Sequence, residues 1–122
     1  MVNGKRKEKR NKCKKERRTL IKNIKDYQVF DDSTFTKKDI ETDGETKRFV
    51  LNFNPGQILP AHKHLNTQLF LTVIEGSGRL FHGLENYTIS EQDIIHCSGD
   101  ETISIENNKK EQLSIYVIIT SN

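Results

Sequence analysis

The feature that most restricts the fold of this chain is a series of short apolar segments, rich in β-branched and aromatic residues and separated by turn residues. Sequences such as Asp43-Gly44, Asn54-Pro55-Gly56 and Gly76-Ser77-Gly78 break the pattern, and each suits a tight turn. Short strands at this spacing predict a sandwich or a small barrel. The predicted strands span residues 38–41, 48–54, 67–74, 78–81, 87–89, 93–97, 102–106 and 113–120.

Composition supports the same fold class. From Tyr27 onward, 34 of 96 residues are apolar, and they include 11 Ile but a single Ala. Branched side chains suit a pleated surface, whereas a helical core normally uses Ala, Leu and Met. We therefore expect an all-β domain. Residues 67–74 and 113–120 carry apolar side chains on both faces, so we expect a second sheet or a second subunit to cover them.

Charge divides the chain into two parts. Residues 1–26 hold 12 Lys and Arg against 3 acids, whereas residues 27–122 hold 8 against 14. The basic part repels itself, so we expect a disordered tail at 1–26 followed by one domain at 27–122. The tail could contact nucleic acid phosphates or anionic lipid, be a solvated extension, or be a gene-model artefact that precedes a true translation start near Leu20. It has no aromatic residue to stack on bases, and the body is acidic, which argues against sequence-specific nucleic acid binding.

Two further features concern location and thiol chemistry. The sequence has no apolar run long enough for a membrane helix and no secretory signal, so we expect a cytoplasmic protein. Cys13 and Cys97 are far apart in sequence and are expected to be free thiols.

The main chemical signal is a pair of histidines, His62 and His64, in the segment Pro60-Ala61-His62-Lys63-His64. On an extended strand, residues i and i+2 point to the same side, so both imidazoles can face one ion or one substrate.

The spacing around this pair resembles the first motif of the cupin superfamily. That motif runs Gly, five residues, His-x-His, three or four residues, Glu, six residues, Gly, and here Gly56, His62, His64, Leu69 and Gly76 occupy its positions. A degenerate second motif ends at Asn107 and places Ile103 at the position of its His. The resemblance implies a jelly-roll-like antiparallel β-barrel of two packed sheets, commonly a homodimer, with a pocket inside it.

The departures from the motifs bear on metal binding. Cupins that hold a metal generally use two His and a Glu of the first motif and the His of the second, whereas this chain has Leu69 and Ile103 at the last two positions. Two imidazoles alone make a weak site for a divalent metal. His96, if it shares the inward face, or Gln68 could add a ligand for Zn, Mn, Fe, Ni or Cu.

We therefore expect a ligand pocket formed by His62, His64, Leu69 and Ile103. The first hypothesis is a cupin-domain protein that binds a small molecule, with or without a divalent metal at the His pair, and is non-enzymatic or weakly active. The second is a metal-dependent enzyme of the dioxygenase or isomerase type. The third is a nucleic-acid-associated protein that acts through its basic tail. The depleted ligand set favours the first hypothesis over the second.

Overall fold

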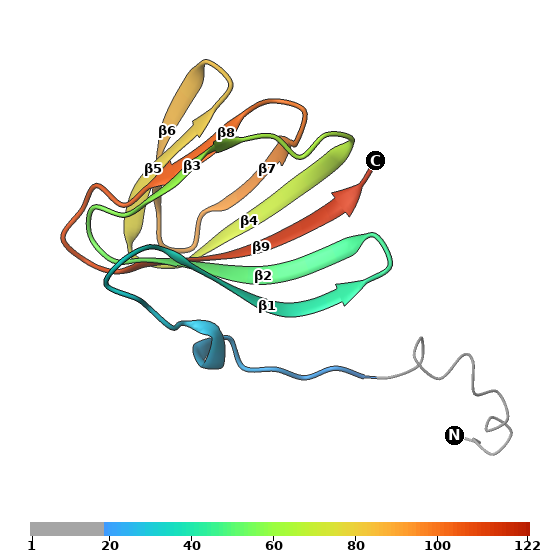
Figure 1. Cartoon of the computed structure of the whole chain (residues 1–122), viewed down its shortest axis with the longest axis horizontal. Helices are drawn as coiled ribbons and strands as arrows, with labels where there is room; N and C mark the ends of the chain where they lie inside the picture. Colours follow the sequence, from blue (N-terminus) through green and yellow to red (C-terminus); the bar gives the residue numbers. More distant parts are fainter. Residues whose placement is uncertain (1–18) are drawn as a thin grey trace, which may run out of the picture.

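The structure is a computed structural model and describes residues 19–122; residues 1–18, which include most of the basic tail, lie outside it. The described chain forms two β-sheets that face each other (Figure 1). Its elements are the 3₁₀ helix η3 (Ile24–Tyr27) and the strands β1 (Thr36–Asp43), β2 (Thr46–Phe53), β3 (Ile58–His62), β4 (Thr67–Glu75), β5 (Ser77–His82), β6 (Glu85–Ser90), β7 (Ile94–Ser98), β8 (Ile103–Glu106) and β9 (Leu113–Ser121). Within residues 19–122, no helix has the length and apolar character needed to cross a membrane.

The strands are arranged as the jelly-roll expectation requires. One sheet has the order β1-β2-β9-β4-β7 and the other β3-β8-β5-β6, and every strand pair is antiparallel. The prediction of an all-β fold of two packed sheets is confirmed.

The sheets do not close into a barrel, and that part of the prediction is wrong. In the described chain β6 pairs only with β5, and β7 pairs only with β4, although β6 and β7 are consecutive. The short turn between them carries the chain from one sheet to the other, so the two strands form opposing edges instead of a ladder (Figure 1).

Strand β3 is the one strand that the apolar pattern did not predict. It lies at the edge of the four-stranded sheet, and its side chains are only partly buried or exposed. Pro60 lies inside it, and a register shift separates Leu59 from His62 in its ladder with β8. An irregular edge strand with a central proline needs little apolar alternation, which is why the sequence signal was weak.

The core lies between the two sheets, because alternate residues of each strand face inward. Its most completely buried side chains come from both sheets and include Phe53, Leu71, Leu80, Ile105 and Ile115. Large branched side chains from opposing sheets fill the interior, as the high Ile content predicts.

The chain's own N-terminal segment covers part of the outer face of the larger sheet. The Asn52 side chain is fully buried there; its Nδ2 donates to the Tyr27 carbonyl at 2.8 Å, and Ser114 Oγ donates to its Oδ1 at 2.7 Å. Around Asn52 and Ser114, the outer cover of β2 and β9 is therefore the N-terminal segment of the same chain. The predicted boundary between tail and domain, after Asp26, falls inside η3.

Candidate ligand-binding site

The two histidines of the motif lie side by side at the end of β3. Their ring centroids are 4.5 Å apart, and the rings meet edge to face at 79°. The assumption that both residues share one extended strand is wrong in detail, because β3 ends at His62 and His64 lies in the following loop.

Backbone contacts with Gly99 fix the position of His64. The His64 N–H donates to the Gly99 carbonyl at 2.8 Å, and Thr67 Oγ1 donates to the His64 carbonyl at 2.6 Å. A Cβ atom at position 99 would lie 2.2 Å from the His64 oxygen and 2.3 Å from Thr67 Oγ1. Glycine is therefore required there by the close approach of the loop, not by its backbone angles.

The hydrogen bonding of the pair determines which ring nitrogens are available. His62 Nδ1 lies 2.8 Å from the Pro60 carbonyl, which can only accept, so Nδ1 carries the proton and Nε2 has the free lone pair in the neutral ring. Burial lowers the pKa of His64 below its ordinary value, and the positive charges of His62, Lys47 and Lys37 lower it further. His64 is therefore largely neutral near pH 7 and can both donate and accept a hydrogen bond.

Behind the pair lies a cavity of about 150 Å³ with an almost entirely apolar lining. All four residues of the predicted pocket, His62, His64, Leu69 and Ile103, contribute to its wall. The side chains of Leu69 and Ile103 are buried, at 3% and 2% exposure. The remaining lining residues are Lys37, Phe49, Leu51, Leu59, Leu71, Ile105, Val117 and Ile119.

The structure does not bring His96 or Gln68 to this cavity. In the β4–β7 ladder Leu69 is opposite Cys97 and faces the core, so the next pair, Phe70 and His96, faces outward. On that outer face the His96 ring stacks on Phe70 at 4.4 Å, and its Nε2 lies 2.8 Å from Gln68 Oε1. The alternation of side chains along a strand thus separates both residues from the His pair.

The donor atoms present do not fit a complete metal site. Two imidazoles are the only strong ligands in the cavity wall, and within residues 19–122 no group of three or more His, Cys, Asp or Glu could hold a metal ion. A divalent transition metal normally takes at least three protein ligands in a catalytic site.

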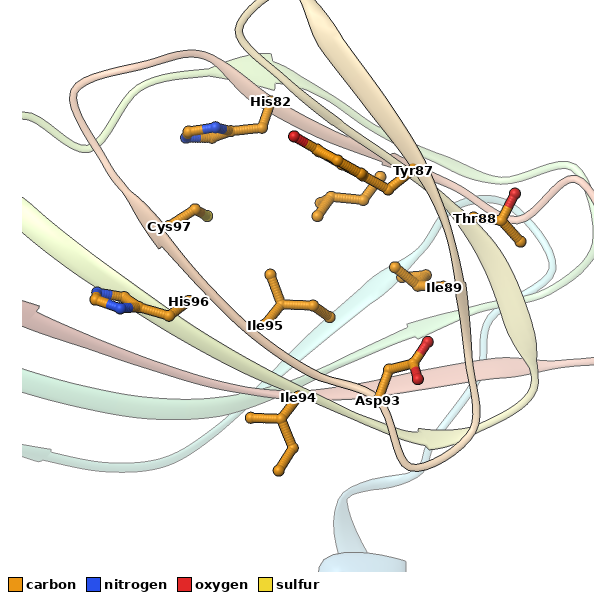
Figure 2. A pocket seen from close by; sticks show the side chains of 10 residues that line it. His82, Tyr87, Thr88, Ile89, Asp93, Ile94, Ile95, His96 and Cys97 are labelled. Carbon is orange, nitrogen blue, oxygen red and sulfur yellow. The ribbon is translucent and has the colours of Figure 1, made fainter.

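The sequence motifs gave no role to His82, which precedes Gly83. It is the last residue of β5, and its ring Nε2 donates to the Ser98 carbonyl at 2.8 Å. Ile103 pairs with His62 on one side and with His82 on the other, so the three residues form one row on the inner face of the smaller sheet. The alternation Leu80-Phe81-His82, with Leu80 inward, could have placed it. Figure 2 shows His82 at the open side of the sandwich.

Comparison with known proteins shows the class of fold. No protein-family model and no curated protein matches the sequence. Among solved structures, an uncharacterised conserved protein of Klebsiella pneumoniae with a double-stranded β-helix domain is similar, with a TM-score of 0.79 and 17% identity over 85% of this chain and 91% of that one. A protein of Thermus thermophilus has a TM-score of 0.80 and 14% identity over 84% of this chain and 98% of that one. The chain is therefore a double-stranded β-helix protein.

A third structure makes the fold more specific. An RmlC-like cupin from Desulfovibrio desulfuricans has a TM-score of 0.76 and 20% identity, and the match covers 84% of this chain and 97% of that one. This chain has the cupin fold, as the spacing of its first motif predicted. At this level of identity the similarity defines the fold, and function has to be argued from the site.

Proposed function

We propose that this protein binds a small molecule with an apolar body and one polar group, in the cavity behind His62 and His64. The observation that carries the proposal is a pair of adjacent imidazoles in the wall of an otherwise apolar cavity of about 150 Å³. Ligand sites commonly combine an apolar wall with a few convergent polar groups. This cavity is smaller than the usual range of about 300–1,000 Å³ for ligand pockets, so it suits a molecule of few atoms.

The two imidazoles define the polar group that the ligand should carry. The free Nε2 lone pair of His62 accepts a hydrogen bond, and neutral His64 can donate one. Lys37 also lines the cavity, but Asp39 is 2.6 Å from its ammonium group and already balances its charge. A hydroxyl, amide or carboxylic acid group satisfies this arrangement.

Nuclear magnetic resonance of the ¹⁵N-labelled full chain, screened against small branched acids, alcohols and amides, tests this proposal. We expect saturable shifts of the amides of His62, His64 and Leu69, and we expect the His62→Ala/His64→Ala variant to bind at least about tenfold more weakly, equivalent to about 1.4 kcal/mol. The matched control is His82→Ala, which removes an imidazole that is likewise hydrogen-bonded to a backbone carbonyl. The proposal is wrong if no probe shifts the cavity residues, or if the double variant binds as the parent does.

A metal-dependent enzyme is the second candidate, and the donor set argues against it. Of the four ligands that the cupin resemblance implies, His62 and His64 are present and Leu69 and Ile103 replace the other two. Elemental analysis of protein purified without a His tag separates the candidates. A stoichiometric transition metal in that protein would reverse their order.

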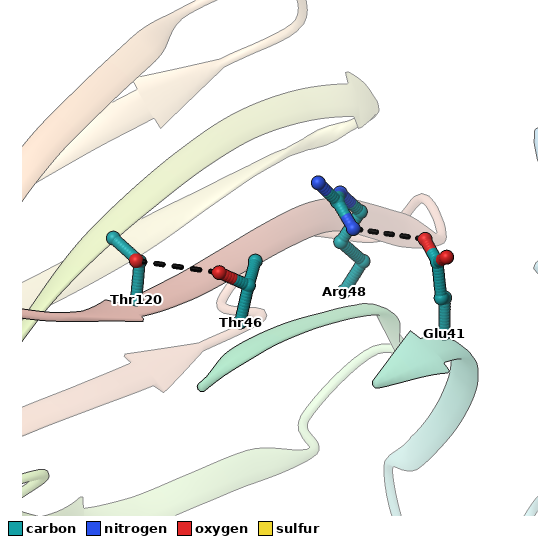
Figure 3. A network of polar contacts seen from close by, with 4 residues as sticks. All are labelled: Glu41, Thr46, Arg48 and Thr120. Atoms are coloured by element: carbon teal, nitrogen blue, oxygen red, sulfur yellow. Dashed lines mark hydrogen bonds and ion pairs between the residues drawn. The ribbon is translucent and has the colours of Figure 1, made fainter. Parts of the chain in front are cut away.

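We also propose that the protein forms a homodimer through the outer face of its larger sheet. Near β1 and β2 this face carries polar contacts, in which Arg48 pairs with Glu41 at 2.8 Å and Thr46 with Thr120 at 3.4 Å (Figure 3). Toward β7 it exposes apolar side chains instead, with Ile94 81% exposed. Sedimentation of the parent and of an Ile94→Asp variant tests the interface, because a buried charge should dissociate it.

The nucleic acid hypothesis stays a prediction. The basic residues on which it depends lie almost entirely within residues 1–18, outside the described part of the chain.

A further inference from the structure

A second and larger hollow lies at the open side of the sandwich, between the edges of β6 and β7 (Figure 2). Its volume is about 480 Å³, against about 150 Å³ for the cavity behind the His pair. We name it the edge groove. No residue lines both hollows, so the edge groove is a separate place on the molecule. Its size falls within the range of about 300–1,000 Å³ that is usual for small-molecule sites.

The edge groove exists because the two sheets do not close. β6 and β7 each pair on one side only, and the turn that joins them holds their free edges apart. Leu80, Ile89 and Ile95, which belong to or pack against the core, form an apolar floor. Such a floor, wide enough for a planar or branched group, supplies the hydrophobic part of a binding site.

The polar groups around this floor are mainly hydrogen-bond acceptors. His82 Nε2 donates to the Ser98 carbonyl, which leaves Nδ1 as an acceptor in the neutral ring. Asp93 lies at the opposite end (Figure 2); its Oδ2 accepts from the Ser90 N–H at 2.7 Å, and the carboxylate has further lone pairs. Tyr87, half exposed, lies beside the floor and provides both an aromatic face and a hydroxyl.

The charge of the lining is one-sided. It contains the Asp93 carboxylate and the imidazoles of His82 and His96, and no Lys or Arg among the described residues that form it. A ligand with a donor group, and above all a cationic one, is therefore favoured over an anion. The Tyr87 ring lies toward the His82 end of the groove (Figure 2), so it would pack against the apolar body of a ligand whose cation is at Asp93.

We propose that the edge groove binds a small aromatic or branched aliphatic amine, with its apolar body on the floor of Leu80, Ile89 and Ile95 and its ammonium group toward Asp93. The proposal does not depend on the function of the His62/His64 cavity. It differs from that cavity in the ligand it selects, since the His pair accepts acids and neutral molecules.

Titration of the ¹⁵N-labelled full chain with phenethylamine tests the proposal, and 3-phenylpropionate serves as the anionic counterpart of similar size. We expect saturable shifts at Tyr87–Ile89 and Ile95–Cys97, with a Kd of roughly 1 mM, as expected of a ligand this small. The anion should bind at least about tenfold more weakly. The Tyr87→Ala variant should weaken amine binding severalfold.

The Asp93→Asn variant tests the charge separately from the fold, because the Asn oxygen can still accept from the Ser90 N–H. It should reduce the preference for the amine over the acid. Leu84→Ala is the matched surface control, since Leu84 is fully exposed in the adjacent turn and does not line the groove; its amine affinity should equal that of the parent.

Four results would overturn the proposal. One is the absence of saturable shifts at the groove; another is equal binding of the amine and the acid by the parent. The third is a shift of Tyr87–Ile89 on simple dilution without ligand, which would show that a second copy of the chain reaches the floor of the groove and not only Ile94 on its β7 side. Loss of amine binding in the His62→Ala/His64→Ala variant would place the amine in the other cavity and would also contradict it.

Discussion

Replacing Leu69 by Glu and Ile103 by His should convert the cavity behind His62 and His64 into a divalent metal site. Ile103 is directly opposite His62 in the β3–β8 ladder, and Leu69 lines the same cavity from the other sheet. Directly opposite residues have Cβ atoms about 4.5–5.5 Å apart, so the new imidazole would lie within reach of a metal held by His62. A carboxylate and a third imidazole supply the ligands that the parent lacks.

The structure also indicates how much stability the double substitution should cost when no metal is bound. Leu69 and Ile103 are 3% and 2% exposed, so the new carboxyl group would be buried without a partner. Burial raises the pKa of such a carboxyl group, and we expect the metal-free variant to be less stable than the parent by roughly 3 kcal/mol.

Added Zn²⁺ should restore most of this loss. At a free concentration of 100 times Kd, binding to the folded state contributes about 2.7 kcal/mol. For a domain of this size that corresponds to a rise in Tm of about 10 °C. Calorimetric titration and thermal unfolding with and without Zn²⁺ measure both quantities.

The matched control is the pair Leu71→Glu with Ile105→His, which introduces the same residues two positions further along the same strands. Leu71 and Ile105 line the same cavity and are each 1% exposed, so the loss of stability should be similar. Two residues along a strand amount to about 7 Å, too far for the new groups to join the His pair. The reasoning is refuted if the control binds Zn²⁺ as tightly, or if the Leu69/Ile103 variant binds no better than the parent.

Three further predictions follow from the site. Burial lowers the pKa of His64, so on acidification this histidine takes up a proton in the unfolded state before it does so in the folded state. The free energy of unfolding should therefore be highest above about pH 6.5 and should fall below that pH. Urea midpoints of the parent should fall more on acidification than those of His64→Gln. Gly99→Ala places a Cβ 2.2 Å from the His64 carbonyl oxygen and should reduce stability by roughly 1–3 kcal/mol in urea unfolding; an unchanged urea midpoint would contradict the close approach of the loop. Burial raises the pKa of the Cys97 thiol, so in a Cys13→Ser background its alkylation by iodoacetamide should reach half its maximal rate at a higher pH than that of free cysteine, and an equal or lower midpoint would contradict the burial argument.

Eight of the nine strands within residues 19–122 and the adjacency of the His pair could be predicted from the sequence, because both depend on local patterns. β-branched and aromatic segments between turn residues define strands by themselves. The spacing of Gly56, His62, His64 and Gly76 likewise indicated the cupin fold before any contact was known. Strand β3 escaped because an edge strand interrupted by Pro60 has little apolar alternation.

The sequence did not predict on which face of the sheets the side chains of His82 and His96 lie. His96 seemed able to join the pair, yet the β4–β7 register pairs it with Phe70 on the outer face. The motifs gave His82 no role, yet the β5–β8 register pairs it with Ile103 on the inner face. A shift of one residue in the pairing register moves every side chain of a strand to the opposite face of the sheet. A small error in a predicted strand end therefore assigns a histidine to the wrong face.

The sequence by itself determined the fold class, the strand segments and the presence of two imidazoles with only apolar residues at the other two motif positions. Only the tertiary structure decided how these parts meet. Contacts between segments far apart in the chain decide three features: whether the two sheets close, which loop approaches closely enough to require Gly99, and which hollow Tyr87 and Asp93 line. Local patterns carry the preferences of single segments, whereas register and sheet edges are set by the packing of all of them together.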